Sequence, residues 1–179
     1  MSSLTRRATL AATVLAVSGA AERALAAATA KPAPLPVPPD ATELARRIQK
    51  REISALEAVD AAIARAQTLQ PKLNALVTPM FERARDEAKQ RDRTWNLMGG
   101  VMGPFAGVPF LIKDLNDVKG VPTRSGSRWT AALPPATAQD AYIDACEQAG
   151  LICIGKSATP EYGFLPTTEP LAFGPTRNP

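Results

Sequence analysis

The sequence lacks histidine entirely, and its 179 residues include only two cysteines. Without an imidazole, the segment cannot assemble a Ser-His-Asp or Cys-His site, and zinc would have to bind to two cysteines and carboxylates. We therefore expect neither a metal site nor a cofactor. Cys146 and Cys153 are interpreted as buried free thiols, and a disulfide between them is left open as the alternative.

Clustered positive charge is also scarce. The chain has 21 Lys/Arg and 17 Asp/Glu residues, a formal net charge of +4, and part of that excess lies near the N-terminus. No Lys/Arg cluster is interleaved with aromatic residues, which make up only 5% of the sequence. This balance predicts that nucleic acid is not a partner.

The first 30 residues have the layout of an export signal. A short basic start is followed by an apolar, alanine-rich stretch at 8–21 and by small residues suited to cleavage at 24–28. The adjacent Arg6 and Arg7 indicate the twin-arginine type, with an ordinary secretory signal as the alternative. The apolar stretch is shorter than the ~20 residues of a spanning helix, so no stable membrane anchor is expected. Residues 1–30 thus predict a periplasmic or secreted protein.

A proline-rich linker and two helices are predicted to follow. Residues 31–40 contain five prolines, which hold a chain extended. Apolar residues then recur at helical spacing, which predicts one helix over 41–50 and a second that begins at Ser54. The Ser54 hydroxyl and Glu57 have the spacing of a capping box, and Pro71 is predicted to end the second helix.

The remaining pattern alternates between short apolar runs and helical spacing. It predicts strands at 73–77, 108–112 and 151–154, helices at 81–93 and 139–149, and a loop at 99–107. The run at 108–112 is predicted to be buried on both faces. This alternation indicates an α/β fold, with a sheet covered by helices.

Lys113 stands out because it directly follows the apolar run that ends at Ile112 and directly precedes Asp114. An ammonium at the end of a buried strand must find charged partners or lose its proton more easily than a solvated lysine. An unprotonated lysine can serve as a general base, the role that histidine would otherwise fill. We expect Lys113 to lie in a partly dry pocket. Position alone also allows a solvated surface pair with Asp114.

Several short motifs in this order resemble the amidase signature family. They are Gly107-Val108-Pro109 before Lys113-Asp114, Gly120-Val121-Pro122-Thr123 before Ser125-Gly126-Ser127, Gly155-Lys156-Ser157 before Pro160-Glu161-Tyr162-Gly163, and Phe173 to Pro179 (FGPTRNP). The agreement covers about residues 41–179. It implies the N-terminal part of an α/β/α fold with a mixed sheet. Ala158 departs from the family, which commonly has asparagine after the Gly-Lys-Thr turn.

The resemblance implies a chemistry for Lys113. The family hydrolyses amides through a Ser, cis-Ser, Lys triad, so Lys113 would be the base and Asp114 a structural support. Residues 41–179 would end before the Gly/Ser-rich segment that supplies both serines, and Ser125 and Ser127 are interpreted as loop or substrate-channel residues.

The implied substrate is a small amide, and 167–179 resembles the branch with nylon-oligomer cyclic-dimer hydrolases and broad-specificity amidases. Two alternatives stay open. One is a protein like the family's amidotransferase subunits, which would act on mischarged transfer RNA in the cytoplasm. The other is a truncated product without activity, since half a sheet would leave apolar faces and a strand edge exposed. The oligomeric state is not predicted.

Overall fold

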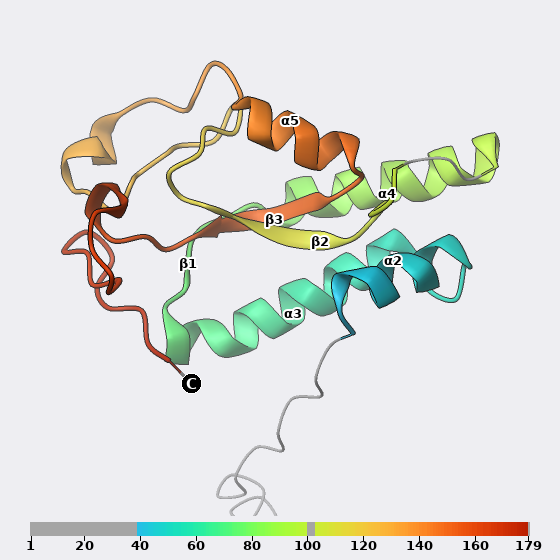
Figure 1. Cartoon of the computed structure of the whole chain (residues 1–179), viewed down its shortest axis with the longest axis horizontal. Coiled ribbons are helices and arrows are strands. Elements are labelled where there is room, and N and C mark those ends of the chain that lie inside the picture. The colour runs from blue at the N-terminus through green and yellow to red at the C-terminus, as the bar shows by residue number, and fades with distance from the viewer. Residues whose placement is uncertain (1–38, 100–102, 179) are drawn as a thin grey trace, which may run out of the picture. The chain divides into compact units, whose positions relative to one another are not determined.

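The computed structural model describes residues 39–99 and 103–178, all of which belong to the unit Pro38–Pro179. The signal peptide predicted for 1–30 and most of the linker predicted for 31–40 lie outside the described residues. Figure 1 shows how the helices and strands are arranged.

The elements follow one another as helices first, then strands alternating with helices. In chain order they are α2 (Ala41–Gln49), α3 (Ala55–Leu73), β1 (Leu76–Pro79), α4 (Phe81–Met98), β2 (Pro109–Lys113), the 3-10 turn η1 (Trp129–Ala132), α5 (Ala141–Gln148), β3 (Ile152–Ser157) and the 3-10 turn η2 (Glu161–Gly163).

The first two helices begin at the predicted residues because side chains cap them. The Asp40 carboxylate accepts a hydrogen bond from the Glu43 N–H at 2.8 Å, so the last linker residue is the N-cap of α2. At α3, the Ser54 hydroxyl accepts from the Glu57 N–H, and the Glu57 carboxylate accepts from the Ser54 N–H. The predicted capping box is therefore confirmed.

The predicted end of α3 at Pro71 is wrong, because the helix continues to Leu73. Pro71 lies in the last turn, where its missing N–H removes one hydrogen bond from a helix that is about to end. The helix stops at Asn74, which has a left-handed backbone (φ 50°) and donates its N–H to the Gln70 carbonyl. Strand β1 consequently starts at Leu76, three residues after the predicted start.

The three strands form one mixed sheet in the order β1-β3-β2. Strand β3 pairs in parallel with β2 and antiparallel with β1, as predicted for a mixed sheet. β3 extends to Ser157, past the predicted end at Ile154. Gly155, Lys156 and Ser157 therefore lie in the strand, and their interpretation as a turn is wrong.

Helices cover both faces of the sheet, which confirms the predicted α/β class (Figure 1). On one face, Ile152 and Ile154 of β3 pack against apolar residues of α3 and α4. On the other, Ile143 of α5 packs with Ile112 and Cys153. The sheet thus forms the middle layer, with an apolar core on each side.

Strand β2 is less buried than predicted. Ile112 is 1% exposed, whereas Leu111 is 43% exposed and Lys113 is also exposed. Alternate side chains of a strand point to opposite faces, so Leu111 and Lys113 share the face opposite Ile112. Among the described residues, nothing covers this part of that face, and β2 pairs with β3 only.

Gly155 allows β1 and β3 to approach closely. A Cβ atom there would lie 2.6 Å from Leu76 Cδ1 and 2.8 Å from the Thr78 carbonyl oxygen. We expect Gly155→Ala to lower the free energy of unfolding by about 1–3 kcal/mol in urea titrations, since the backbone of β1 must move.

The matched control is Gly120→Ala, where a Cβ would meet nothing within 4 Å but the backbone is left-handed (φ 79°). That change is expected to cost about 1 kcal/mol, because a residue with a Cβ atom is strained in the left-handed region. If Gly155→Ala cost no more than Gly120→Ala, the proposed contact with β1 would be wrong.

Both cysteines are buried free thiols, as predicted. Burial raises the pKa of the Cys153 thiol. Within 39–99 and 103–178, no His/Cys/Asp/Glu cluster is placed to hold a metal ion. The helices of these two ranges include none with the length and hydropathy needed to cross a membrane.

Candidate functional site

Parallel strands β2 and β3 bring several charged residues to one edge of the sheet. Both strands end at this edge, where the Asp114 N–H donates to the Ser157 carbonyl at 3.0 Å. We call residues 113–114 and 156–158 the carboxyl edge. Ligands of α/β sheets commonly bind just outside such strand ends. Lys113, Asp114 and Lys156 therefore form the candidate site.

Lys113 is exposed, and its side chain forms no hydrogen bond or ion pair with any other residue that the structure describes. The expected partly dry pocket is thus not formed by these residues, because the face shared with Leu111 is uncovered. A surface pair with Asp114 is not formed either. Below the side chain, the Lys113 carbonyl accepts from the N–H groups of Leu115 and Asn116 at 2.7 and 3.2 Å, which anchors the strand end.

Asp114 points inward and forms a buried ion pair with Lys156. Lys156 Nζ lies 2.9 Å from Asp114 Oδ1, and both side chains are 0% exposed. The ammonium also donates to the Pro122 carbonyl at 3.0 Å and to Thr123 Oγ1 at 2.6 Å. The Arg124 N–H lies 3.2 and 3.3 Å from the two carboxylate oxygens. A buried ion pair needs such additional partners to offset its desolvation.

The charge partner of Lys156 was not predicted from the sequence. The sequence around Lys156 resembles that around Lys113, because both lysines lie close to the end of a short apolar run. It was missed because 155–157 was interpreted as a turn, which would place the ammonium in solvent. Once β3 includes Lys156 opposite Ile112 in the β2 register, the side chain lies in the interior.

The two loop serines do not form a catalytic pair with Lys113. Ser127 is 2% exposed, and its hydroxyl donates to Glu161 at 2.5 Å and accepts from the Trp129 N–H. Ser125 has a left-handed backbone, and its N–H donates to the Asp114 carbonyl at 3.1 Å. Ser125 thus joins the loop to the carboxyl edge, whereas Ser127 joins it to Glu161 of η2. Their interpretation as loop or substrate-channel residues stays a prediction.

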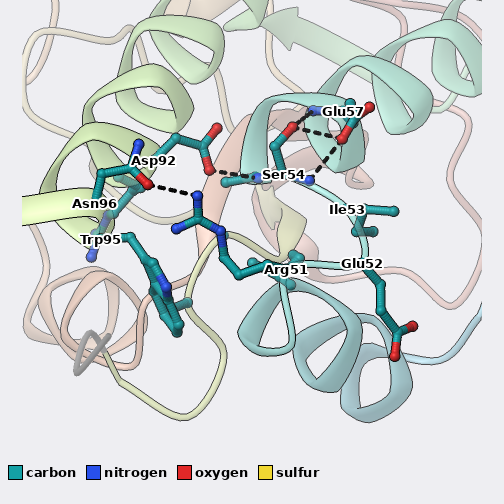
Figure 2. A pocket seen from close by; sticks show the side chains of 13 residues that line it. Arg51, Glu52, Ile53, Ser54, Glu57, Asp92, Trp95 and Asn96 are labelled. Atoms are coloured by element: carbon teal, nitrogen blue, oxygen red, sulfur yellow. Dashed lines mark hydrogen bonds between the residues drawn. The ribbon is translucent and has the colours of Figure 1, made fainter. Parts of the chain in front are cut away.

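A separate cavity of about 330 Å³ lies between the start of α3 and the side of α4 (Figure 2). Lys113 does not line it. The Asp92 carboxylate accepts from the first two N–H groups of α3 at 2.9 and 3.1 Å, and Arg51 donates to Asn96 at 2.6 Å. Asp92 and Arg51 therefore already have hydrogen-bond partners within the chain. The cavity is distinct from the carboxyl edge.

The capping box beside this cavity predicts a pH-dependent stability effect. Hydrogen bonds from the Ser54 N–H and then from its hydroxyl hold the pKa of Glu57 below its ordinary value of 4.5. A depressed carboxyl pKa contributes stability above the unfolded value and loses it as the pH falls through the folded value. We expect Ser54→Ala to cost about 1 kcal/mol at pH 7 in urea unfolding.

At a pH well below 4.5, where Glu57 becomes protonated, the difference between wild type and Ser54→Ala should shrink. Ser2→Ala, outside the described residues, provides a serine control. A cost that stays constant as the pH falls from 7 through the range in which Glu57 is protonated in the folded chain would contradict the role of the charged Glu57 in this cap.

Comparisons with known proteins agree with the resemblance. The family described as Amidase matches residues 57–179. The 6-aminohexanoate-cyclic-dimer hydrolase of Paenarthrobacter ureafaciens is 39% identical over 142 residues, covering 78% of this chain and 27% of that protein. A glutamyl-tRNA(Gln) amidotransferase subunit of Lachnospira eligens is 38% identical over 139 residues, with coverages of 78% and 28%.

A solved structure shares the fold. It is described as an unexpected vestigial protein complex that reveals the evolutionary origins of an s-triazine catabolic enzyme. It matches with a TM-score of 0.75 and 33% identity, and covers 79% of this chain and 31% of that one. The chain thus spans less than a third of the length of these relatives. With a family match over most of its described residues, the chain belongs to the amidase signature family.

Proposed function

We propose that this chain supplies the general base of an amidase that hydrolyses carboxylic amide C–N bonds of a small molecule. The observation that carries the proposal is the position of Lys113. It ends a parallel strand at the carboxyl edge, and its amine has no hydrogen-bond or ion-pair partner among the residues that the structure describes, while the adjacent Asp114 is already neutralised by Lys156. An amine that no other group holds can take part in proton transfer once it is in the uncharged form.

The proposed mechanism uses the family's Ser, cis-Ser, Lys triad. Unprotonated Lys113 takes a proton, through the cis-serine, from a nucleophilic serine that attacks the amide carbonyl. The C–N bond breaks as the amine leaves with a proton, and an acyl-enzyme remains. Water then attacks the ester, regenerates the serine and releases the acid. Asp114 supports the strand end without touching the reacting atoms.

Neither serine of this triad has been identified within the described residues. They would come from the remainder of an amidase domain, which would also cover the exposed face of Leu111 and Lys113 and remove water from the amine. Loss of water at that face would favour the uncharged form of the lysine that proton transfer requires.

The test compares the chain alone with a complete amidase domain that begins with it. Purified residues 1–179 are expected to release no aniline from a simple aryl amide, whereas the complete domain should hydrolyse it. Turnover by 1–179 that Lys113→Ala abolishes would require a nucleophile inside the segment, and would contradict the proposed source of the serines.

A cyclic or linear amide is the favoured substrate class, because the hydrolase relative acts, by its name, on the cyclic dimer of 6-aminohexanoate. The second candidate is an amidotransferase subunit, favoured by the 38% identity to the amidotransferase relative in Lachnospira eligens. We propose export through the signal predicted at 1–30, which argues against work on transfer RNA in the cytoplasm.

A reporter fused behind residues 1–40 separates these candidates. Delivery to the periplasm that stops in the Arg6→Lys/Arg7→Lys double variant supports an exported amidase of the twin-arginine type. Retention of the reporter in the cytoplasm would remove this argument and favour the amidotransferase candidate.

A further inference from the structure

The negative charge of the Asp114 carboxylate would hinder Lys113 from acting as a base if no other group compensated it. This carboxylate belongs to the residue directly after Lys113, and it is fixed in the interior with 0% exposure. A nearby negative charge favours the ammonium form of a lysine, which cannot accept a proton. An uncompensated Asp114 would therefore oppose the use of Lys113 as a base.

Lys156 is placed to compensate the charge of the Asp114 carboxylate by direct contact. Its Nζ lies 2.9 Å from Asp114 Oδ1, and its other two hydrogens point to the Pro122 carbonyl and Thr123 Oγ1. The three contacts and the lack of exposure to solvent hold the ammonium of Lys156 in place beside the Asp114 carboxylate.

Other charged groups near the edge are turned to different partners. The Arg124 guanidinium donates to the carbonyls of Thr130 and Leu133. The Glu161 carboxylate accepts from Ser127, and the Asp140 carboxylate accepts from Asn116 and the Asp117 N–H. Lys156 is thus the cation that neutralises Asp114 among the residues that the structure describes.

We propose that Lys156 is the positioning and charge-compensating residue of the carboxyl edge. It cancels the charge of Asp114, so that the Lys113 amine can be uncharged, and it fastens residues 122–123 to the end of β3. This inference rests on the proposed role of Lys113 as the base, and it assigns the two lysines different tasks. Lys113 takes part in proton transfer, while Lys156 serves as the counterion of Asp114.

The test is the rate at which acetic anhydride acylates Lys113 in the 1–179 chain at pH 8 and low ionic strength. Peptide mass spectrometry reads the rate, and exposed Lys119 serves as the internal reference. Only the uncharged amine reacts, so the rate follows the charge state of Lys113. Lys156→Met leaves Asp114 uncompensated and should slow acylation about two- to threefold, the size of an effect between charges that water and salt partly screen.

The reciprocal variant, Asp114→Asn, leaves Lys156 as the uncompensated charge and should speed acylation by a similar factor. The double variant Asp114→Asn/Lys156→Met should return the rate to that of the wild type. Opposite signs in the two single variants distinguish compensation from structural support, because mere loosening of the strand end would shift both rates in the same direction. In 1 M NaCl the differences should shrink.

Equal rates in all variants, or shifts of the same sign, would overturn the proposal. The proposal would also be overturned if Lys113 of the wild type were acylated as fast in the folded chain as in urea, and if Asp114→Asn left that rate unchanged. If Lys156→Met does not fold, as judged by circular dichroism, Asp114→Asn and the double variant still decide the sign. The acylation experiment does not measure turnover. If a complete domain with Lys113→Ala were active, the proposed role of Lys113 as the base would be refuted, but the acylation rates would be unaffected.

Discussion

Lys113→Ala is expected to lower kcat/KM for an aryl amide by about a thousandfold or more in a complete amidase domain that contains this chain. Removal of a general base typically costs 10²- to 10⁴-fold, and the loss is larger when the base is part of a triad that acts as a unit. Steady-state kinetics with a chromogenic anilide measure the effect.

The effect should be confined to activity. In the 1–179 chain, Lys113 is exposed and its side chain forms no hydrogen bond or ion pair within the described ranges, so Lys113→Ala should change the free energy of unfolding of that chain by no more than about 0.5 kcal/mol. Lys119→Ala is the matched control, an exposed lysine six residues further on, and should retain activity within about twofold. Near-normal activity of Lys113→Ala would contradict its assignment as the base.

The largest stability effect is expected at the buried ion pair. Lys156→Met leaves the Asp114 carboxylate without a counterion at 0% exposure and removes the hydrogen bonds to Pro122 and Thr123. Removing one partner of a buried pair costs about 3–5 kcal/mol, a large part of the stability of an ordinary domain. Urea unfolding followed by circular dichroism measures this loss.

The double variant Asp114→Asn/Lys156→Met should recover most of that loss, because an uncharged pair of similar size no longer leaves a charge buried alone. A cost below about 1 kcal/mol for Lys156→Met alone would mean that solvent reaches Asp114, and the buried pair would be incorrect. A double variant that remains as unstable as Lys156→Met would show that the hydrogen bonds dominate.

Local signals in the sequence predicted the starts of the helices well. The capping box of Ser54 and Glu57 acts over three residues, so it can be recognised without knowing the fold. The Asp40 cap of α2 was not predicted, because Asp40 was assigned to the linker. The end of α3 was predicted less well. Its stop depends on the left-handed Asn74, and on Gln70, whose side chain accepts from the N–H groups of Ala75 and Leu76. Pro71 alone does not reveal these contacts.

The sequence pattern did not predict the features that depend on how the strands pair and on what covers them. The end of β3 and the burial of Lys156 follow from its place between β1 and β2, with Lys156 opposite Ile112. Leu111 is exposed because none of the described residues covers this part of the face that it shares with Lys113. The run of apolar residues could not distinguish a strand covered on one face from a strand covered on both.

The candidate site was therefore predictable in part. The apolar run before Lys113 and the family resemblance singled out that lysine, whose catalytic role stays a proposal. The partner of Asp114 could not be found in the same way, because 42 positions separate it from Lys156 in the printed sequence. Only the parallel pairing of β2 with β3 brings them to 2.9 Å.

The most direct test of the central claim is the rate at which the complete domain forms an acyl-enzyme from an aryl amide. Rapid quenching and intact-protein mass spectrometry detect the acyl group on the enzyme. We expect the adduct to appear in the wild type and in Lys119→Ala, and to be absent from Lys113→Ala on the same time scale. Formation of the adduct in Lys113→Ala at the wild-type rate would show that another group activates the nucleophile.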